Sequence, residues 1–479
     1  MTLRIFSCVC LIIATGCASV PAVQHPTLEI ALPEEWSAEN SRSGALEVTW
    51  WEDFDDSGLA AAIDVALSQN YDLRAATARL EQAAAAAEAT EGDLQPTLQT
   101  TFNGSRRKQN FVGFPIPGSE GQVLSTVSTN YGVSLDLSWE IDLWGRLRNT
   151  ARAALTDLQA SAADLRGVQL SIAGQTTKAW FAIAEAQQQV DLSRQTVRSF
   201  QSSVEQVQER FNAGIRPALD LRLALLNLSN AEAQLQQSLQ QFDGTVRQLQ
   251  LLLGQYADGQ FETPTELPEI TPEVPAGLPA NLVARRPDLA GAERRLAGFL
   301  IRADVARSDL LPRLSLTNAT GTATDGLRSL IDGNFGVWSL LGNVVAPLWQ
   351  GGRLRAQVER ADAQGAEALA NYANAALTAY AEVETALASE EFLAERERHL
   401  TESALQARAA ERLAEERYRA GLENYITVLD SQRSAVSAEA SLITARQTRL
   451  ENRVDLYLAL GGGFEQLEAP VQLSVLEGQ

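Results

Sequence analysis

Residues 145–148 read Gly-Arg-Leu-Arg, and the same four residues return at 352–355. The match continues at a constant shift of 207 residues, so that Arg-Phe-Asn-Ala-Gly at 210–214 becomes Arg-Tyr-Arg-Ala-Gly at 417–421. Glycines and hydrophobic positions stay in step over the whole length of the match. A unit this long is a duplicated module with its own internal plan, not a short solenoid repeat.

The first copy predicts a long antiparallel helical hairpin. Residues 146–213 contain no proline and would form a helix about 100 Å long at about 1.5 Å per residue. Gly214 can end this helix in a left-handed conformation, and Pro217 suits the first turn of a returning helix. The return segment 218–253 repeats apolar residues at alternating spacings of four and three, as packed helices do.

The second copy predicts the same hairpin over 352–460, with its turn at Gly421. The face of the returning helix that would pack on its partner is here called the seam. This seam is more polar than in the first copy, because Arg446, Arg449 and Arg453 replace apolar residues there. Two explanations remain open at this point. Either that helix face turns away from its partner, or it meets water.

A different period precedes each long helix. Residues 127–139 place an apolar residue or threonine at every odd position, which predicts a β-strand with one apolar and one polar face. With a partner that begins after Pro96, this strand would form a hairpin over about 97–140, and the second copy predicts a hairpin over about 313–345. The pattern suits strands that cross a membrane, although a soluble hairpin packed on helices would alternate similarly.

The segment that precedes Gly145 in the first copy is longer than the segment that precedes Gly352 in the second. Pro96 matches Pro312 at a shift of 216 residues, so 216 − 207 = 9 extra residues lie between Pro96 and Gly145. We expect them to extend the loop between the first two strands. That loop would hold the basic residues 106–108 together with Phe111 and Phe114, as a solvated tip.

Four strands are too few to close a membrane barrel, because the smallest such barrels have about eight. Open strand edges are also not tolerated in lipid. We therefore expect the chain to form an oligomer.

The N-terminus is typical of an exported lipoprotein. Arg4 precedes an apolar run over 5–14, and the small residues before Cys17 resemble a lipobox. Cys8 and Cys10 would leave with the signal, so Cys17 would be the only cysteine of the processed chain. We expect Cys17 to be acylated; the alternative is an ordinary signal peptide cut nearby.

Composition disfavours several function classes. The net charge of −21 argues against binding nucleic acid or broad anionic surfaces. The histidines are His25 and His399, and neither a phosphate-binding loop nor a dinucleotide fingerprint is present. We therefore expect neither an enzyme nor a cofactor or metal site.

A set of short motifs occurs in a fixed order along the chain. It comprises Trp-Trp-Glu-Asp-Phe at 50–54, Ser-Trp-Glu-Ile-Asp-Leu-Trp-Gly-Arg at 138–146, Arg-Arg-Pro-Asp-Leu at 285–289, Leu-Pro-Arg-Leu-Ser-Leu at 311–316, Pro-Leu at 347–348 with Gly-Gly-Arg at 351–353, Tyr-Arg-Ala-Gly-Leu at 418–422, and residues 456–463. In this order they resemble TolC-type outer-membrane efflux channels, specifically the lipoprotein branch that serves resistance-nodulation-division pumps.

The resemblance implies a mostly α, internally duplicated, TolC-like fold. Long helical hairpins would form a periplasmic α-barrel, and a homotrimer would build a 12-stranded outer-membrane β-barrel from four strands per chain. The expected parts are a signal peptide at 1–16, an N-terminal anchor and equatorial segment at 17–56, a first repeat at 57–254, a Pro-rich connector at 255–279, a second repeat at 280–461 and a C-terminal equatorial tail at 462–479.

The implied function is a passive exit duct in a tripartite efflux system. Small molecules expelled by an inner-membrane pump would pass through a periplasmic membrane-fusion adaptor into this lipid-anchored outer-membrane channel. One alternative is the outer-membrane channel of a type I protein secretion system. A purely structural periplasmic coiled coil is a second alternative, which the strand pattern disfavours.

The resemblance also implies two kinds of site residue. Adaptor contact is expected at the two helical turns, formed by Ala213, Gly214 and Ile215 and by Ala420, Gly421 and Leu422. A closed periplasmic aperture is expected beyond the turns, where the family carries an acidic pair. Here those positions hold Thr427 and Asp430, so only one matches, and Asp220 stands at the related position of the first copy. Each aspartate could instead interact only with its helix dipole.

Overall fold

The computed structural model describes residues 36, 49–111, 123–270, 274 and 285–462. Every described residue belongs to one compact unit within Leu32–Gln479. The signal peptide, Cys17, His25, Phe114, the tail from residue 463 and most of the connector beyond residue 270 lie outside the described residues.

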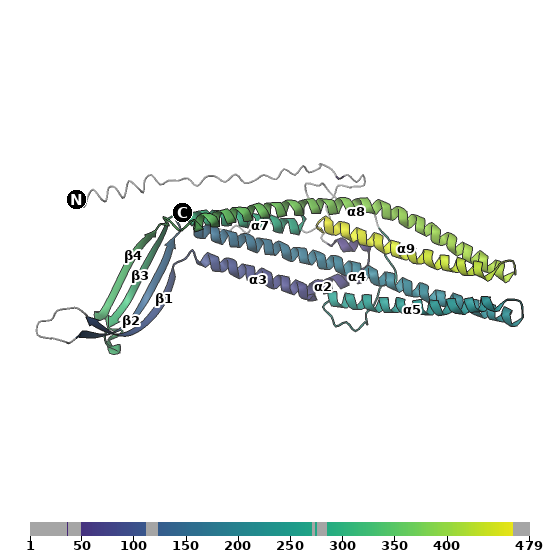
Figure 1. Cartoon of the computed structure of the whole chain (residues 1–479), viewed down its shortest axis with the longest axis horizontal. Coiled ribbons are helices and arrows are strands. Elements are labelled where there is room, and N and C mark those ends of the chain that lie inside the picture. The colour runs from purple at the N-terminus through teal and green to yellow at the C-terminus, as the bar shows by residue number, and fades with distance from the viewer. Residues whose placement is uncertain (1–35, 37–48, 112–122, 271–273, 275–284, 463–479) are drawn as a thin grey trace. The chain divides into compact units, whose positions relative to one another are not determined.

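The elements of the described part follow one another in two similar series (Figure 1). The first series comprises η1 (Trp50–Phe54), α2 (Ser57–Gln69), α3 (Tyr71–Gly92), β1 (Thr97–Phe111), β2 (Leu124–Ile141), α4 (Arg146–Asn212) and α5 (Ala218–Leu252). The second comprises α7 (Pro287–Ser308), β3 (Arg313–Thr324), η2 (Leu327–Ser329), η3 (Gly333–Phe335), β4 (Gly336–Val345), α8 (Arg353–Arg419) and α9 (Tyr425–Ala459). The expected alternation of short helix, strand pair and long helical hairpin is confirmed in both.

Short polar side chains start the first helices. The carboxylate of Asp56 accepts hydrogen bonds from the amides of Gly58 and Leu59 at 2.9 and 3.1 Å, which caps α2. Asn70 caps α3 in the same way, and its amide group also donates to the carbonyl of Leu252 at 2.9 Å. That second bond ties the start of α3 to the end of α5.

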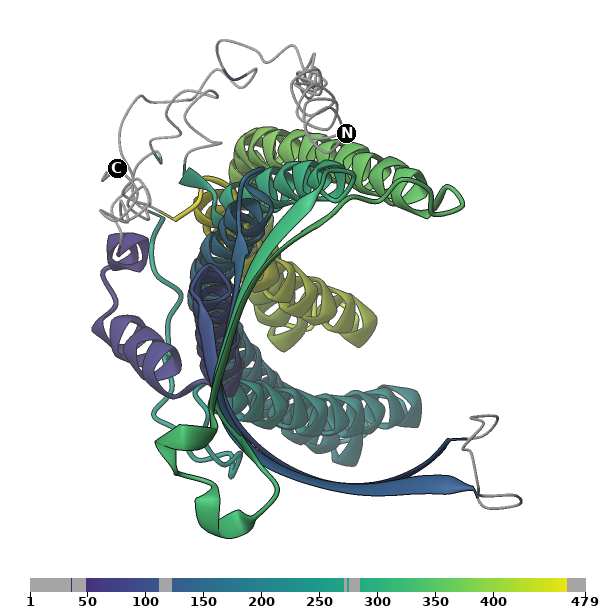
Figure 2. The same ribbon diagram turned by 90° about the vertical axis from the view of Figure 1, so that its left-hand side faces the viewer.

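The four strands form one antiparallel sheet in the order β1-β2-β3-β4 (Figure 1). The sheet is curved, as the view along the long axis shows (Figure 2). Leu98 lies opposite Leu137, Trp139 opposite Leu316, and Asn318 opposite Leu340. The middle pair joins the two repeats, because β2 belongs to the first and β3 to the second.

The predicted loop around the basic residues 106–108 is wrong. These residues lie inside β1 and pair with 127–129 of β2. β1 and β2 have 15 and 18 residues, against 12 and 10 for β3 and β4. The extra length of the first copy therefore lies mainly in the strands, because the segments between the paired strands, 112–123 and 325–335, are almost equally long.

Arginines hold α7 between the long helices of both repeats. The ion pairs are Arg295 with Asp164 and Arg302 with Asp157, both on α4, and Arg307 with Asp362 on α8. The first two pairs are seven residues apart on both helices, so they fix the antiparallel register of α7 on α4.

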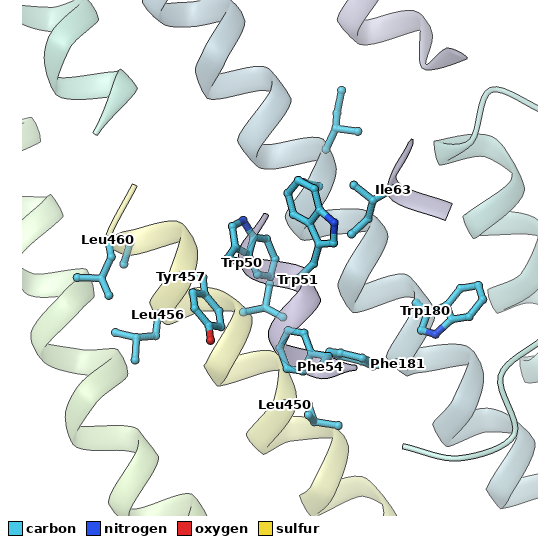
Figure 3. Close-up of a cluster of buried hydrophobic side chains, with 14 of the residues drawn as sticks. Trp50, Trp51, Phe54, Ile63, Trp180, Phe181, Leu450, Leu456, Tyr457 and Leu460 are labelled. Atoms are coloured by element: carbon cyan, nitrogen blue, oxygen red, sulfur yellow. The ribbon is translucent and has the colours of Figure 1, made fainter. Parts of the chain in front are cut away.

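The main hydrophobic core joins the start of the described chain to both repeats (Figure 3). The ring of Trp50 stacks on Tyr457 of α9 with centroids 5.0 Å apart, and Phe54 meets Phe181 of α4 edge-on at 5.0 Å. The Tyr457 hydroxyl donates to the Asp53 carboxylate at 2.5 Å. Burial and this hydrogen bond raise the pKa of the Tyr457 phenol.

The polar seam of α9 follows neither explanation offered by the sequence. Arg449 and Arg453 both point at the Glu390 carboxylate of α8, at 3.1 and 2.9 Å, and Arg453 is only 6% exposed. Glu397, also on α8, binds Arg446 and Arg449 at 3.3 and 3.0 Å. The seam therefore faces its partner helix, and ion pairs stand where the first copy has apolar contacts.

No helix within the described ranges is both long enough and apolar enough to cross a membrane.

Candidate functional site

The two faces of the sheet differ in chemistry. Residues directly opposite each other in the register share a face, so the pairing sorts every side chain. One face, here called the apolar band, carries Leu98, Phe102, Val133, Leu135, Leu137, Trp139, Ile141, Leu314, Leu316, Trp338, Leu340 and Val344. The other face carries mainly Ser, Thr, Asn and Gln on β1, β2 and β3. Only β4 is apolar on both faces, through Val337, Leu341 and Val345.

The height of the apolar band matches a membrane. Along β2 it extends from Tyr131 to Ile141, a rise of about 33 Å at about 3.3 Å per residue. At the usual strand tilt of about 40° this covers about 25 Å, the height of the lipid-facing band of membrane strands. Beyond Tyr131 the same face continues with Thr129 opposite Arg106 and Val127 opposite Lys108, so the continuous apolar band ends there.

The polar face carries hydrogen bonds between side chains of neighbouring positions. Asp136 of β2 accepts hydrogen bonds from the hydroxyls of Thr101 at 2.8 Å and Ser134 at 3.0 Å. The contrast between this face and the apolar band fits a sheet with lipid on one side and water on the other.

The two helical turns have the same geometry. Gly214 and Gly421 adopt φ of +73° and +78°, a region in which a side chain would be strained. The amide of Gly214 donates to the Phe211 carbonyl at 2.9 Å, and that of Gly421 donates to the Tyr418 carbonyl at 3.0 Å. The next residue in each turn, Ile215 or Leu422, is 68% or 70% exposed.

The first turn holds the second through two arginines that the sequence analysis missed. Arg210 donates to the main-chain carbonyls of Tyr418 and Arg419 at 2.9 and 2.8 Å. Arg216 donates to the carbonyl of Glu423 at 2.9 Å. Both guanidinium groups also lie over the Tyr418 ring, at 4.6 and 5.0 Å from its centroid.

Arg210 and Arg216 are here called the arginine clasp. Two tyrosines next to it form a small group, here called the tyrosine cluster. Tyr418 and Tyr425 are 3% and 1% exposed, and their rings are 5.6 Å apart. Burial raises the pKa of Tyr425, and the nearby Tyr418 and Asp220 add to the effect. The cluster therefore joins the end of α8, the start of α9 and the start of α5.

The three candidate aperture residues lie in different surroundings. Asp220 is buried, at 9% exposure, beside the tyrosine cluster. Asp430 is exposed and forms no ion pair with any residue in the described part of the chain. Thr427 donates a hydrogen bond to Glu423 at 3.1 Å. Within one chain, the carboxylates of Asp220 and Asp430 are not joined by a shared contact.

Comparison with known proteins places these features in context. Residues 62–255 and 278–462 match the family described as Outer membrane efflux protein. Outer membrane protein OprJ of Pseudomonas aeruginosa is 32% identical over 457 residues, covering 94% of each chain. The toluene efflux pump outer membrane protein TtgF of Pseudomonas putida is 28% identical over 465 residues, covering 95% of this chain and 96% of its own.

Two solved outer-membrane channels have the same fold as this chain. The outer-membrane channel OprN has a TM-score of 0.83 and 28% identity, covering 92% of this chain and 98% of its own. The CmeC outer membrane channel of Campylobacter jejuni has a TM-score of 0.86 and 26% identity, covering 94% of this chain and 96% of its own.

Proposed function

The chain belongs to the outer membrane efflux protein family, and from that premise we propose that three copies form one duct through the outer membrane. The chain is an outer-membrane channel of a tripartite efflux pump, not an enzyme. The single observation that carries the trimer is the apolar band on a sheet whose two outer strands, β1 and β4, each have one partner within the chain. Unpaired edges are costly in lipid, and three copies would supply the twelve strands of a closed barrel.

The helices support the same assembly. Within one chain they contact each other in the order α5, α4, α9 and α8, so α5 and α8 are the two ends of a row. Both end helices expose large apolar side chains. These are Leu219 and Leu226 on α5, and Phe392, Leu405 and Leu413 on α8. In a ring of three, α5 of one chain would cover α8 of the next and bury these residues.

Native mass spectrometry of the detergent-solubilised protein tests the assembly. We expect a complex of three chains, and we expect the same preparation to conduct ions in planar bilayers. A stable single chain that conducts would contradict the proposal, because four strands with open edges would then suffice.

We propose that the chain is anchored through Cys17 as a lipoprotein, with its helices in the periplasm. The support is the apolar run at 5–14 followed by small residues and the cysteine. The N-terminal peptide of the mature protein is expected to begin at acylated Cys17 in mass spectrometry. An unmodified start at another residue would show that an ordinary signal peptide is cut instead.

We propose that the two helical turns contact a periplasmic adaptor, which links the channel to an inner-membrane resistance-nodulation-division pump. The contact residues would be Ala213, Gly214 and Ile215 in the first turn and Ala420, Gly421 and Leu422 in the second. Ile215 and Leu422 offer exposed aliphatic groups at matching positions, and neither is part of the tyrosine cluster.

Charge at these two positions should interrupt efflux without unfolding the channel. With Ile215→Asp and Leu422→Asp together, we expect cells to lose at least about tenfold in drug tolerance, because a desolvated aspartate opposes an apolar contact. Leu251→Asp is the control, since Leu251 is equally exposed at the other end of α5. If drug tolerance and trimer levels both stayed unchanged, the adaptor would have to contact another part of the channel.

We propose that the closed tip is held by the arginine clasp, and that Asp220, Thr427 and Asp430 lie at or near the aperture. Opening would separate the first turn from the second. The cargo would be small molecules, since relatives are named for toluene efflux and pyoverdine export. These names favour efflux over the alternative of type I protein secretion.

A further inference from the structure

The two copies of Gly-Arg-Leu-Arg begin their helices in different charge environments. In the first copy, Arg146 donates to the Glu140 carboxylate through Nε at 3.1 Å and Nη2 at 2.9 Å. Arg148 donates through Nε to Asp142 at 3.3 Å. Both positive charges at the junction of β2 and α4 are therefore balanced within the chain.

The second copy has the arginines without the carboxylates. Residues 346–352, which join β4 to α8, read Ala-Pro-Leu-Trp-Gln-Gly-Gly and contain no carboxylate. Arg353 is exposed and donates to the side-chain amide of Gln350, which is neutral. Arg355 is also exposed and has no hydrogen bond or ion pair with any residue between 36 and 462 that the structure describes. Two positive charges thus remain unbalanced in a chain whose net charge is −21.

Exposed apolar side chains lie next to these charges. Within a single chain, Leu348 and Trp349 are 95% and 88% exposed. They follow closely after Val344, the last residue of the apolar band on β4, so the exposed apolar surface continues from the band toward the helices. Tryptophan is enriched where a membrane meets water, because its ring is apolar and its N–H is polar.

We infer that this junction, formed by Leu348, Trp349, Arg353 and Arg355, binds anionic phospholipids of the leaflet nearest the helices. The inference rests on the proposed crossing of the membrane by the sheet. Phosphate oxygens accept charge-assisted hydrogen bonds from guanidinium groups, and the acyl region of the same lipid suits Leu348 and Trp349. The first junction lacks this capacity, because Glu140 and Asp142 already occupy its arginines.

Native mass spectrometry of the purified trimer, titrated with phosphatidylglycerol or with phosphatidylcholine of the same acyl chains, tests the site. We expect phosphatidylglycerol to bind about tenfold more tightly, from two arginines at a membrane surface. In the double variant R353Q/R355Q the two lipids should bind equally. Trp349→Ala should weaken both lipids while keeping the preference, because it leaves the charges in place.

The matched control is R396Q/R412Q, which removes two exposed arginines from the same helix, far from the junction. It should retain the full preference. The inference is overturned if the wild type shows no preference, or if the preference survives R353Q/R355Q. It is also overturned if R353Q/R355Q lowers trimer stability without changing lipid binding, since a neighbouring chain would then hold the arginines. Conductance of the same preparations identifies failure of the channel itself: a trimer that conducts but shows no preference contradicts only the lipid site.

Discussion

Replacing both Arg210 and Arg216 with alanine should open the closed tip and raise single-channel conductance at least about twofold. The double variant removes three hydrogen bonds from guanidinium groups to main-chain carbonyls of the second turn. Bonds from charged donors contribute about 1.5–3 kcal/mol each, and the contacts over the Tyr418 ring add to them. Losing all of them favours separation of the turns. Planar-bilayer recording measures the result.

Two control variants separate the clasp from a general charge effect. Arg222→Ala removes an exposed arginine near the start of α5 that has no ion pair in the described structure, so conductance should stay unchanged. Arg210→Lys keeps the charge but cannot span two carbonyls as the planar guanidinium does, so it should open the tip partly. If the double alanine variant conducts like the wild type, the clasp does not hold the closed state.

The aspartates give an independent measure of the aperture. Asp220→Ala with Asp430→Ala should lower cation preference if the carboxylates line the constriction in the trimer, whereas the arginine variants should change conductance first. If ion selectivity is unchanged, the aspartates lie outside the narrowest part of the path.

The architecture could be predicted from the sequence because its signals are local or repeated. Proline-free stretches ending at Gly214 and Gly421 indicated the helical hairpins, and odd-even alternation indicated the sheet. The length of β1 was harder to predict from the sequence, because the charged residues 106–108 look like a loop until the partner strand is known. Their backbone pairing with 127–129 depends on register, which one strand alone does not determine.

The contacts between the two turns and along the seam of α9 could not be predicted, for two physical reasons. Arg210 binds main-chain carbonyls 208 and 209 residues away, and a carbonyl leaves no mark in the sequence. Arg449 and Arg453 depend on Glu390, whose position relative to them is set by the rotation of α8 against α9. The polar seam therefore looked like a face that is rotated away or solvated, whereas the matching charges lie on the other helix of the same hairpin.

That seam leads to the second large effect, a loss of stability in Glu390→Gln. The Glu390 carboxylate serves two arginines, and Arg453 is almost fully buried. Removing the negative charge takes away the carboxylate that binds this guanidinium at 2.9 Å, and breaking a buried pair from one side costs about 3–5 kcal/mol. Glu390 and Arg449 are each about one-fifth exposed, so we expect the lower end of this range, about 3 kcal/mol.

Thermal unfolding of the purified protein should show a clear fall in melting temperature for Glu390→Gln. The matched control is Glu395→Gln on the same helix, where the carboxylate is exposed and binds Arg398 at 2.6 Å. The Arg398 guanidinium lowers the pKa of Glu395 to about 2, yet water screens this pair, so the melting temperature should hardly change. Replacing Glu390, Arg449 and Arg453 together by Leu, Leu and Met should recover much of the loss, because the first copy packs its hairpin with apolar residues. If Glu390→Gln and Glu395→Gln melted alike, the α8–α9 ion pairs would contribute no more than surface pairs.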